Sequence, residues 1–129
     1  MSAIDPQHSH QAIHLDIERA IGYTGDAAAA ADLLRMVEQS LGSDIDKIWQ
    51  KLELGDVAAA GRLIHAIKGF VPMFCHDLLI EQVTRAEALS KTESAVSFKL
   101  VFADVAPELL LLLKDIRSYL SDRGTPGGG

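Results

Sequence analysis

Apolar residues recur along this chain every three or four positions, the spacing that puts them on one face of an α-helix. The longest such series extends over residues 27–54 and keeps its phase past Gly42. Its apolar members are Ala30, Leu34, Val37, Leu41, Ile45, Ile48 and Leu52. The series predicts one long helix, with Asp26 as its N-cap and Gly55 just beyond its end.

A second series predicts a helix over residues 57–74, which begins directly after Asp56 in the N-cap position. The apolar members of this series are Ala60, Ile64, Ile67, Val71 and Phe74. Because Pro72 has no amide hydrogen, the carbonyl group of Lys68 loses its helical partner. We therefore expect a local kink near the end of this helix.

Two further long helices are predicted in the second half of the chain. One covers residues 78–90 with Asp77 as its N-cap, and residues 91–94 form the turn that follows it. The other covers residues 95–120, where Pro107 is expected to kink or divide the helix. The inward-facing residues of the two helices are Leu79, Val83, Ala86, Phe98, Phe102, Val105, Leu109, Leu112, Ile116 and Tyr119.

A shorter series near the N-terminus, formed by Ile13, Ile17 and Ile21, predicts a first helix over residues 11–21 that ends at the glycine-containing segment 22–26. No alternating, strand-like pattern is present. Because short turns join the four long helices, these must be antiparallel neighbours. The sequence thus predicts an all-α, antiparallel up-down-up-down four-helix bundle with a short additional N-terminal helix.

At 129 residues the chain is expected to form one domain. We expect a flexible arm over residues 1–10, the bundle over residues 11–121, and a flexible glycine-rich tail over residues 122–129. The net charge of −6 and the lack of a lysine or arginine cluster argue against a nucleic-acid partner. The longest apolar run is too short to span a bilayer, and the single cysteine fits a reducing compartment. These features predict a cytoplasmic monomer without a membrane partner.

The candidate functional residues lie on the polar face of the second long helix. His65, Lys68 and Gly69 occupy positions i, i+3 and i+4, which are neighbours on a helix surface. Glycine also precedes the histidine by four residues, at Gly61. Since glycine inside a helix costs roughly 0.5–1 kcal/mol relative to alanine, two of them around one histidine indicate that something approaches the imidazole closely.

The residues around His65 on this face are expected to form a docking surface for a partner. They are Ala58, Gly61, Arg62, Pro72, Met73 and His76. His76 lacks a following lysine and glycine, so His65 is the stronger candidate for chemistry. No histidine, cysteine or carboxylate set has a spacing that predicts a metal site.

The segment from His65 to Gly69, HAIKG, fits the His-x-Leu/Ile-Lys-Gly pattern of histidine-containing phosphotransfer (HPt) domains. With the order of predicted helices, this segment makes residues 12–120 resemble that family. The resemblance implies that His65 accepts a phosphoryl group from an aspartate of a response-regulator receiver domain and passes it to another receiver. It also implies that Lys68 lies near the phosphoryl group and that Gly69 leaves room for the partner.

On the same resemblance, the protein is a phosphocarrier without independent turnover. Its partners are receiver domains and a hybrid sensor kinase, and the divalent metal belongs to the receiver, so the chain itself needs no cofactor. The chemistry of the residues agrees: a neutral imidazole, with a reference pKa of about 6.5, is a competent nucleophile near pH 7. One ammonium group a helical turn away would offset the charge of the phosphoryl group.

The chain also departs from the family pattern, because Phe70, Val71 and Cys75 stand where the family usually has small residues or a second glycine. Phe70 lies away from His65 on the helix, so we interpret it as part of the core, and Cys75 as a small apolar filler. Two other classes of function stay open: a bundle that only binds partners, and an enzyme or metal protein built on His65, Cys75 and His76.

Overall fold

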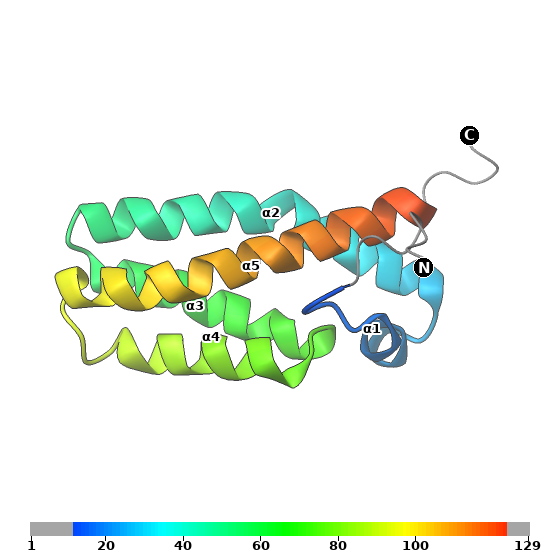
Figure 1. Ribbon diagram of the computed structural model, residues 1–129, viewed down its shortest axis with the longest axis horizontal. Coiled ribbons are helices and arrows are strands. Elements are labelled where there is room, and N and C mark those ends of the chain that lie inside the picture. Colours follow the sequence, from blue (N-terminus) through cyan, green and yellow to red (C-terminus); the bar gives the residue numbers. More distant parts are fainter. Residues whose placement is uncertain (1–11, 124–129) are drawn as a thin grey trace, which may run out of the picture.

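The computed structural model describes residues 12–123, and within this range the chain is helical, with no β-strand (Figure 1). The predicted all-α class is therefore confirmed for this part of the chain. The elements are α1 (Ile17–Thr24), α2 (Ala27–Glu53), α3 (Val57–Phe70), the 3₁₀ turn η2 (Val71–Met73), α4 (Asp77–Leu89) and α5 (Ala95–Arg123). The predicted arm 1–10 and most of the predicted tail lie outside the described residues.

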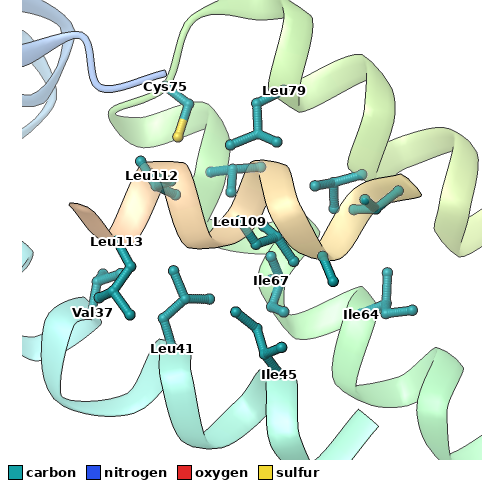
Figure 2. Close-up of a cluster of buried hydrophobic side chains, with 14 of the residues drawn as sticks. Val37, Leu41, Ile45, Ile64, Ile67, Cys75, Leu79, Leu109, Leu112 and Leu113 are labelled. Carbon is teal, nitrogen blue, oxygen red and sulfur yellow. The ribbon is translucent and has the colours of Figure 1, made fainter. Parts of the chain in front are cut away.

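The four longer helices lie side by side along the long axis of the molecule (Figure 1). Helix α2 contacts α3 and α5, and α4 contacts the same two helices from the other side. Their apolar faces meet in one core, where Leu41 of α2, Ile67 of α3, Leu79 of α4 and Leu109 of α5 point toward one another (Figure 2). The apolar series that predicted the four helices are buried as expected, except Tyr119, which is only partly buried.

The helix starts at Asp26 and Asp56 also agree with the prediction. The side chain of Asp26 accepts a hydrogen bond of 2.8 Å from the amide of Ala29, and Asp56 accepts one of 2.9 Å from Ala59. Gly55, between α2 and α3, has a φ of 78°, a left-handed conformation that favours glycine. These local signals position α3, the helix that carries the candidate site.

The predicted first helix is wrong at both of its ends. Helix α1 begins at Ile17 and continues through Gly22 to Thr24, and Ile13 lies outside it with 51% of its surface exposed. The spacing of the isoleucines was misleading because residues 12–16 form a non-helical segment, here called the N-terminal strap. Asp16 ends the strap as the N-cap of α1 and accepts a hydrogen bond from the amide of Arg19.

Hydrogen bonds to distant parts of the chain hold the N-terminal strap. One carboxylate oxygen of Asp115, a buried residue of α5, accepts hydrogen bonds from the amides of Ile13, His14 and Leu15 at 2.9, 2.7 and 3.2 Å. The strap also pairs with the segment after η2, where the amide of His76 donates to the carbonyl of His14 at 2.9 Å. These bonds hold a non-helical backbone where a helix was predicted.

Three smaller predictions need correction. Asp77 is the first residue of α4 rather than its cap, and His76 occupies the N-cap without a side-chain hydrogen bond. Helix α3 ends at Phe70, and the expected kink at Pro72 takes the form of the 3₁₀ turn η2. Pro107 does not divide α5, because Ala103, whose carbonyl lacks a helical partner, is exposed to water.

Helix α5 also extends three residues further than predicted, to Arg123, so the first two residues of the predicted tail belong to it. None of the helices within residues 12–123 combines the length and the apolar character needed to cross a membrane.

Candidate functional site

His65 lies on the outer face of α3, with 70% of its side chain exposed. Its neighbours Ile64 and Ile67 are buried in the core, so they fix the rotation of α3 about its axis and keep the imidazole outside. Lys68 and Gly69 lie on the same side one turn later, as predicted. The helix thus presents an exposed imidazole on a rigid support.

The carboxylate of Glu87 lies beneath this histidine. Glu87 is on α4 and its side chain is only 6% exposed. One carboxylate oxygen is 3.1 Å from the Nζ of Lys68, and the other is 2.9 Å from the Nζ of Lys91. The second oxygen is also 3.7 Å from the Nδ1 of His65. We call His65, Lys68, Glu87 and Lys91 the Glu87 cluster.

The two lysines keep Glu87 ionised. Hydrogen bonds from Lys91 first, and then from Lys68, lower the pKa of the Glu87 carboxyl group below its ordinary value. This effect exceeds the opposite one of burial, which by itself would raise the pKa. At neutral pH a negative charge therefore faces Nδ1 of the imidazole. This charge favours a hydrogen on Nδ1 and leaves the lone pair on Nε2 for chemistry.

The two glycines that flank His65 have different environments. A Cβ atom built on Gly69 would meet nothing within 4 Å, so this face of α3 is open. A Cβ atom built on Gly61 would lie 2.5 Å from the Oγ of Ser90 on the neighbouring helix end. Gly61 is buried and lets α3 approach α4 closely. The prediction that both glycines leave space beside the imidazole is therefore wrong for Gly61.

A groove extends from His65 toward the first turn of α3, and we call it the α3–α4 groove. It has a volume of about 810 Å³ and lies between the first half of α3 and the end of α4 with the following turn. Its lining residues are Val57, Ala58, Gly61, Arg62, His65, Glu87, Ser90, Lys91, Thr92 and Glu93. The groove thus includes three residues of the predicted docking surface, namely Ala58, Gly61 and Arg62.

The other three predicted docking residues do not line this groove. Pro72 is exposed in η2, and Met73 packs partly against the core. His76 is at the start of α4, where its Nδ1 lies 3.5 Å from a carboxylate oxygen of Asp16. The predicted docking surface therefore has two parts: Ala58, Gly61 and Arg62 line the groove, and the other three residues lie outside it.

The residues that depart from the family pattern are part of the interior. The ring of Phe70 stacks on Phe74 with centroids 5.9 Å apart, and Val71 is buried. Cys75 is also buried, and desolvation raises the pKa of its thiol far above the ordinary value. The thiol is therefore protonated and packs as an apolar side chain, in agreement with its interpretation as a filler. Within residues 12–123, no group of three or more histidine, cysteine or acidic side chains could hold a metal ion.

The sequence pattern missed Glu87 and Lys91. Glu87 lies near the end of α4, and Lys91 follows that helix, so the connection through η2 and most of α4 separate both residues from His65 in the sequence. One signal was available: Glu87 follows the buried Val83 by four residues, so it continues the inward face of α4 with a charged side chain. A carboxylate on an inward face indicates a buried ion pair.

No protein-family model, curated protein or solved structure matches this chain. The family resemblance therefore rests on the HAIKG segment and the order of the helices.

Proposed function

We propose that this protein is a phosphorelay intermediate of a two-component signalling system. In this proposal it is an HPt domain, an up-down-up-down four-helix bundle that accepts a phosphoryl group on His65 from a receiver-domain aspartate and passes it to another receiver. One observation carries the proposal: His65 is exposed on α3 while its Nδ1 faces the buried, ionised Glu87. The short turns between successive long helices support the antiparallel topology.

The proposed transfer begins with attack of the lone pair on Nε2 at the phosphorus atom of an aspartyl phosphate. A P–N bond forms, the P–O bond to the aspartate breaks, and the electron pair leaves with the aspartate carboxylate. Nδ1 keeps its hydrogen, so the imidazole ring becomes positively charged as the P–N bond forms. Glu87, 3.7 Å from Nδ1, stabilises this charge. Transfer to a second receiver is the same reaction in reverse.

Lys68 has two partners in this proposal. In the structure its ammonium group binds Glu87 at 3.1 Å, and 37% of its side chain is exposed. After transfer, the same flexible side chain is within one helical turn of a phosphoryl group on Nε2 and offsets its charge. Gly69 leaves the next position on this face open for the receiver.

The partners proposed for this chain are receiver domains and a hybrid sensor kinase. The receiver supplies the divalent metal and its acidic side chains, and this chain acts as a cytoplasmic phosphocarrier without turnover of its own. The competing function, a bundle that binds partners without phosphotransfer, predicts the same groove and the same fold, but it leaves His65 unmodified.

The test is transfer of labelled phosphate from phosphorylated receiver domains to wild type and to two histidine variants. We expect acid-labile label on wild type and on His76→Gln, which is the control because His76 is also exposed. His65→Gln should carry no label, and its melting temperature should change little because the replaced side chain is largely exposed. Label that persists on folded His65→Gln would contradict the proposal, and so would unlabelled wild type with every receiver tested.

A further inference from the structure

We propose that two copies of this chain associate through the outer face of α5, as an antiparallel pair related by a two-fold axis. The residues of this face, here called the outer α5 stripe, are Val96, Leu100, Ala103, Pro107 and Leu110. This association goes beyond the proposed phosphotransfer, and it replaces the single copy expected from the sequence.

The outer α5 stripe is apolar although it faces water. Val96 is 77% exposed, Leu100 74% and Leu110 51%, and Ala103 and Pro107 are also exposed. These residues follow one another in steps of four, three, four and three, the spacing with which helices pack against other helices. The inner face of α5 is buried in the core. A helix that is apolar on both faces is typically covered on both, and one copy of the chain covers only the inner face.

Charged residues border the stripe without interrupting it. At the edge next to α2, the Nζ of Lys99 lies 3.2 Å from a carboxylate oxygen of Glu53. At the edge next to α4, Asp104 and Arg85 line the same hollow between the two helices. An apolar strip inside a polar rim is the arrangement found in protein–protein interfaces.

The order of side chains along the stripe indicates that the partner is a second copy. Leu100 lies as far before position 105 as Leu110 lies after it, and the smaller Ala103 and Pro107 are paired about the same position. A surface that binds itself across a two-fold axis must be self-complementary in this way. In the antiparallel pair, Leu100 therefore packs on Leu110 of the second copy, and Ala103 packs on Pro107 where the two helices approach most closely.

The antiparallel direction also brings opposite charges together. Lys114 is exposed and continues the line of the stripe four residues after Leu110. It lies as far after position 105 as Val96 lies before it, so Lys114 of the second copy comes beside Val96. Glu93 is one helical turn from Val96 and partly exposed, so it is within reach of that ammonium group. A parallel pair would instead place Lys114 beside Lys114, which is unfavourable.

This pair leaves the candidate site accessible. Helix α5 lies between α2 and α4, and α3 contacts the same two helices across the bundle (Figure 1). His65 is on the outer face of α3, so the second copy on α5 does not cover it. A contact along about four turns of one helix is small for a stable interface, so we expect a dissociation constant of about 1–100 µM.

The test is the mass of the full chain by sedimentation equilibrium at concentrations from about 1 to about 500 µM. Wild type should change from the mass of one copy to that of two across this range. Leu100→Glu and Leu110→Glu each place a charge in the stripe and should raise the dissociation constant about tenfold or more. Met36→Glu is the matched control, because Met36 is 67% exposed on α2 and lies outside the stripe. Circular dichroism establishes that each variant is folded.

The direction of the pair is tested by charge exchange, which leaves the apolar residues in place. Glu93→Lys and Lys114→Glu should each weaken the dimer, because like charges then meet at both ends of the interface. The double variant should recover part of the loss, since it restores both pairs with their charges exchanged. A double variant no tighter than the single variants would refute the antiparallel pairing.

Wild type that keeps the mass of one copy at the highest concentration would overturn the proposal, and the stripe would then be open to a different protein. A dimer that Met36→Glu weakens as much as Leu100→Glu would also contradict it, and so would a mass that rises beyond two copies. These measurements do not depend on phosphoryl transfer, so failure of the dimer leaves the proposed function standing.

Discussion

The two ends of the bundle, which Figure 1 shows as a ribbon, differ in how their buried carboxylates are bound. At the end with the N-terminal strap, the carboxylate of Asp115 is buried and binds three backbone amides. At the end with the α3–α4 groove, the buried carboxylate of Glu87 binds the side chains of two lysines that are themselves partly exposed. The first arrangement joins the strap to α5. The second leaves charged groups and an imidazole within reach of a partner, so changes at the two ends should affect different properties.

The largest expected effect is at the strap. Asp115→Ala removes the acceptor of three amides, and the strap cannot rotate them toward water without leaving α5. Because buried donors without partners are costly, the free energy of unfolding should fall by about 3 kcal/mol or more. Urea denaturation measures this change. If the protein has the proposed function, the rate of phosphoryl transfer to His65 should be unchanged at temperatures where the variant is folded.

A loss of less than about 1 kcal/mol in Asp115→Ala would contradict this comparison, because it would mean that the strap contributes little to the fold. A large loss of transfer in the folded variant would also contradict it, since the strap end would then influence the site.

The next effect is at the close contact beneath the groove. Gly61→Ala puts a Cβ atom 2.5 Å from Ser90 Oγ and 3.1 Å from Ser90 Cβ, so the Ser90 side chain or the packing of α3 against α4 must shift. Overpacking of this kind costs about 1–3 kcal/mol and exceeds the gain in helix propensity. Thermal and urea denaturation of Gly61→Ala, Ser90→Ala and the double variant test this. The double variant should recover part of the loss, and simple addition of the two single effects would contradict the proposed contact.

A structural feature could be predicted from the sequence when the residues that form it are close together in the chain. The faces of the long helices and the caps at Asp26 and Asp56 depend on residues within one or two turns, and those predictions are confirmed. The strap depends on Asp115, about a hundred positions away, and no local pattern carries that information. Ile13, Ile17 and Ile21 therefore predicted a helix that tertiary hydrogen bonds override.

The candidate site divides in the same way. His65, Lys68 and Gly69 lie on one turn of α3, and their shared face was predictable from helical spacing alone. Glu87 reaches this turn from another helix, 19 residues after Lys68, and one of its carboxylate oxygens lies 3.7 Å from Nδ1 of His65. The two flanking glycines look equivalent in sequence. Only the position of α4 distinguishes Gly61 from Gly69.

Gly69→Ala should therefore have the opposite sign from Gly61→Ala, with a smaller magnitude. Gly69 is within α3, its φ is not positive, and a Cβ atom there meets nothing within 4 Å. Alanine should raise the free energy of unfolding by about 0.5–1 kcal/mol through helix propensity. Thermal and urea denaturation measure the gain. A destabilised Gly69→Ala would show that this face of α3 is not open.

The smallest expected effect concerns the charge of Glu87, and pH makes it measurable. Lys91 and Lys68 lower the pKa of Glu87 in the folded protein, so the unfolded chain takes up the proton first as the pH falls. The stabilising contribution is therefore fully present above the ordinary carboxyl range, near pH 4.5, and is lost as the pH falls through the lowered pKa. Its size is limited because Lys91 is largely exposed.

Glu87→Gln removes this titration, and Glu81→Gln on the exposed face of α4 is the matched control. Urea denaturation from pH 7 to pH 3 should show wild type more stable than Glu87→Gln at pH 7, with the difference shrinking as the solution becomes acidic. The control should keep a constant difference from wild type across this range. If the advantage of wild type over Glu87→Gln instead grew on acidification, burial would dominate and the pKa of Glu87 would be raised. Glu87 would then be protonated more readily, and the negative charge that faces Nδ1 of His65 would be lost.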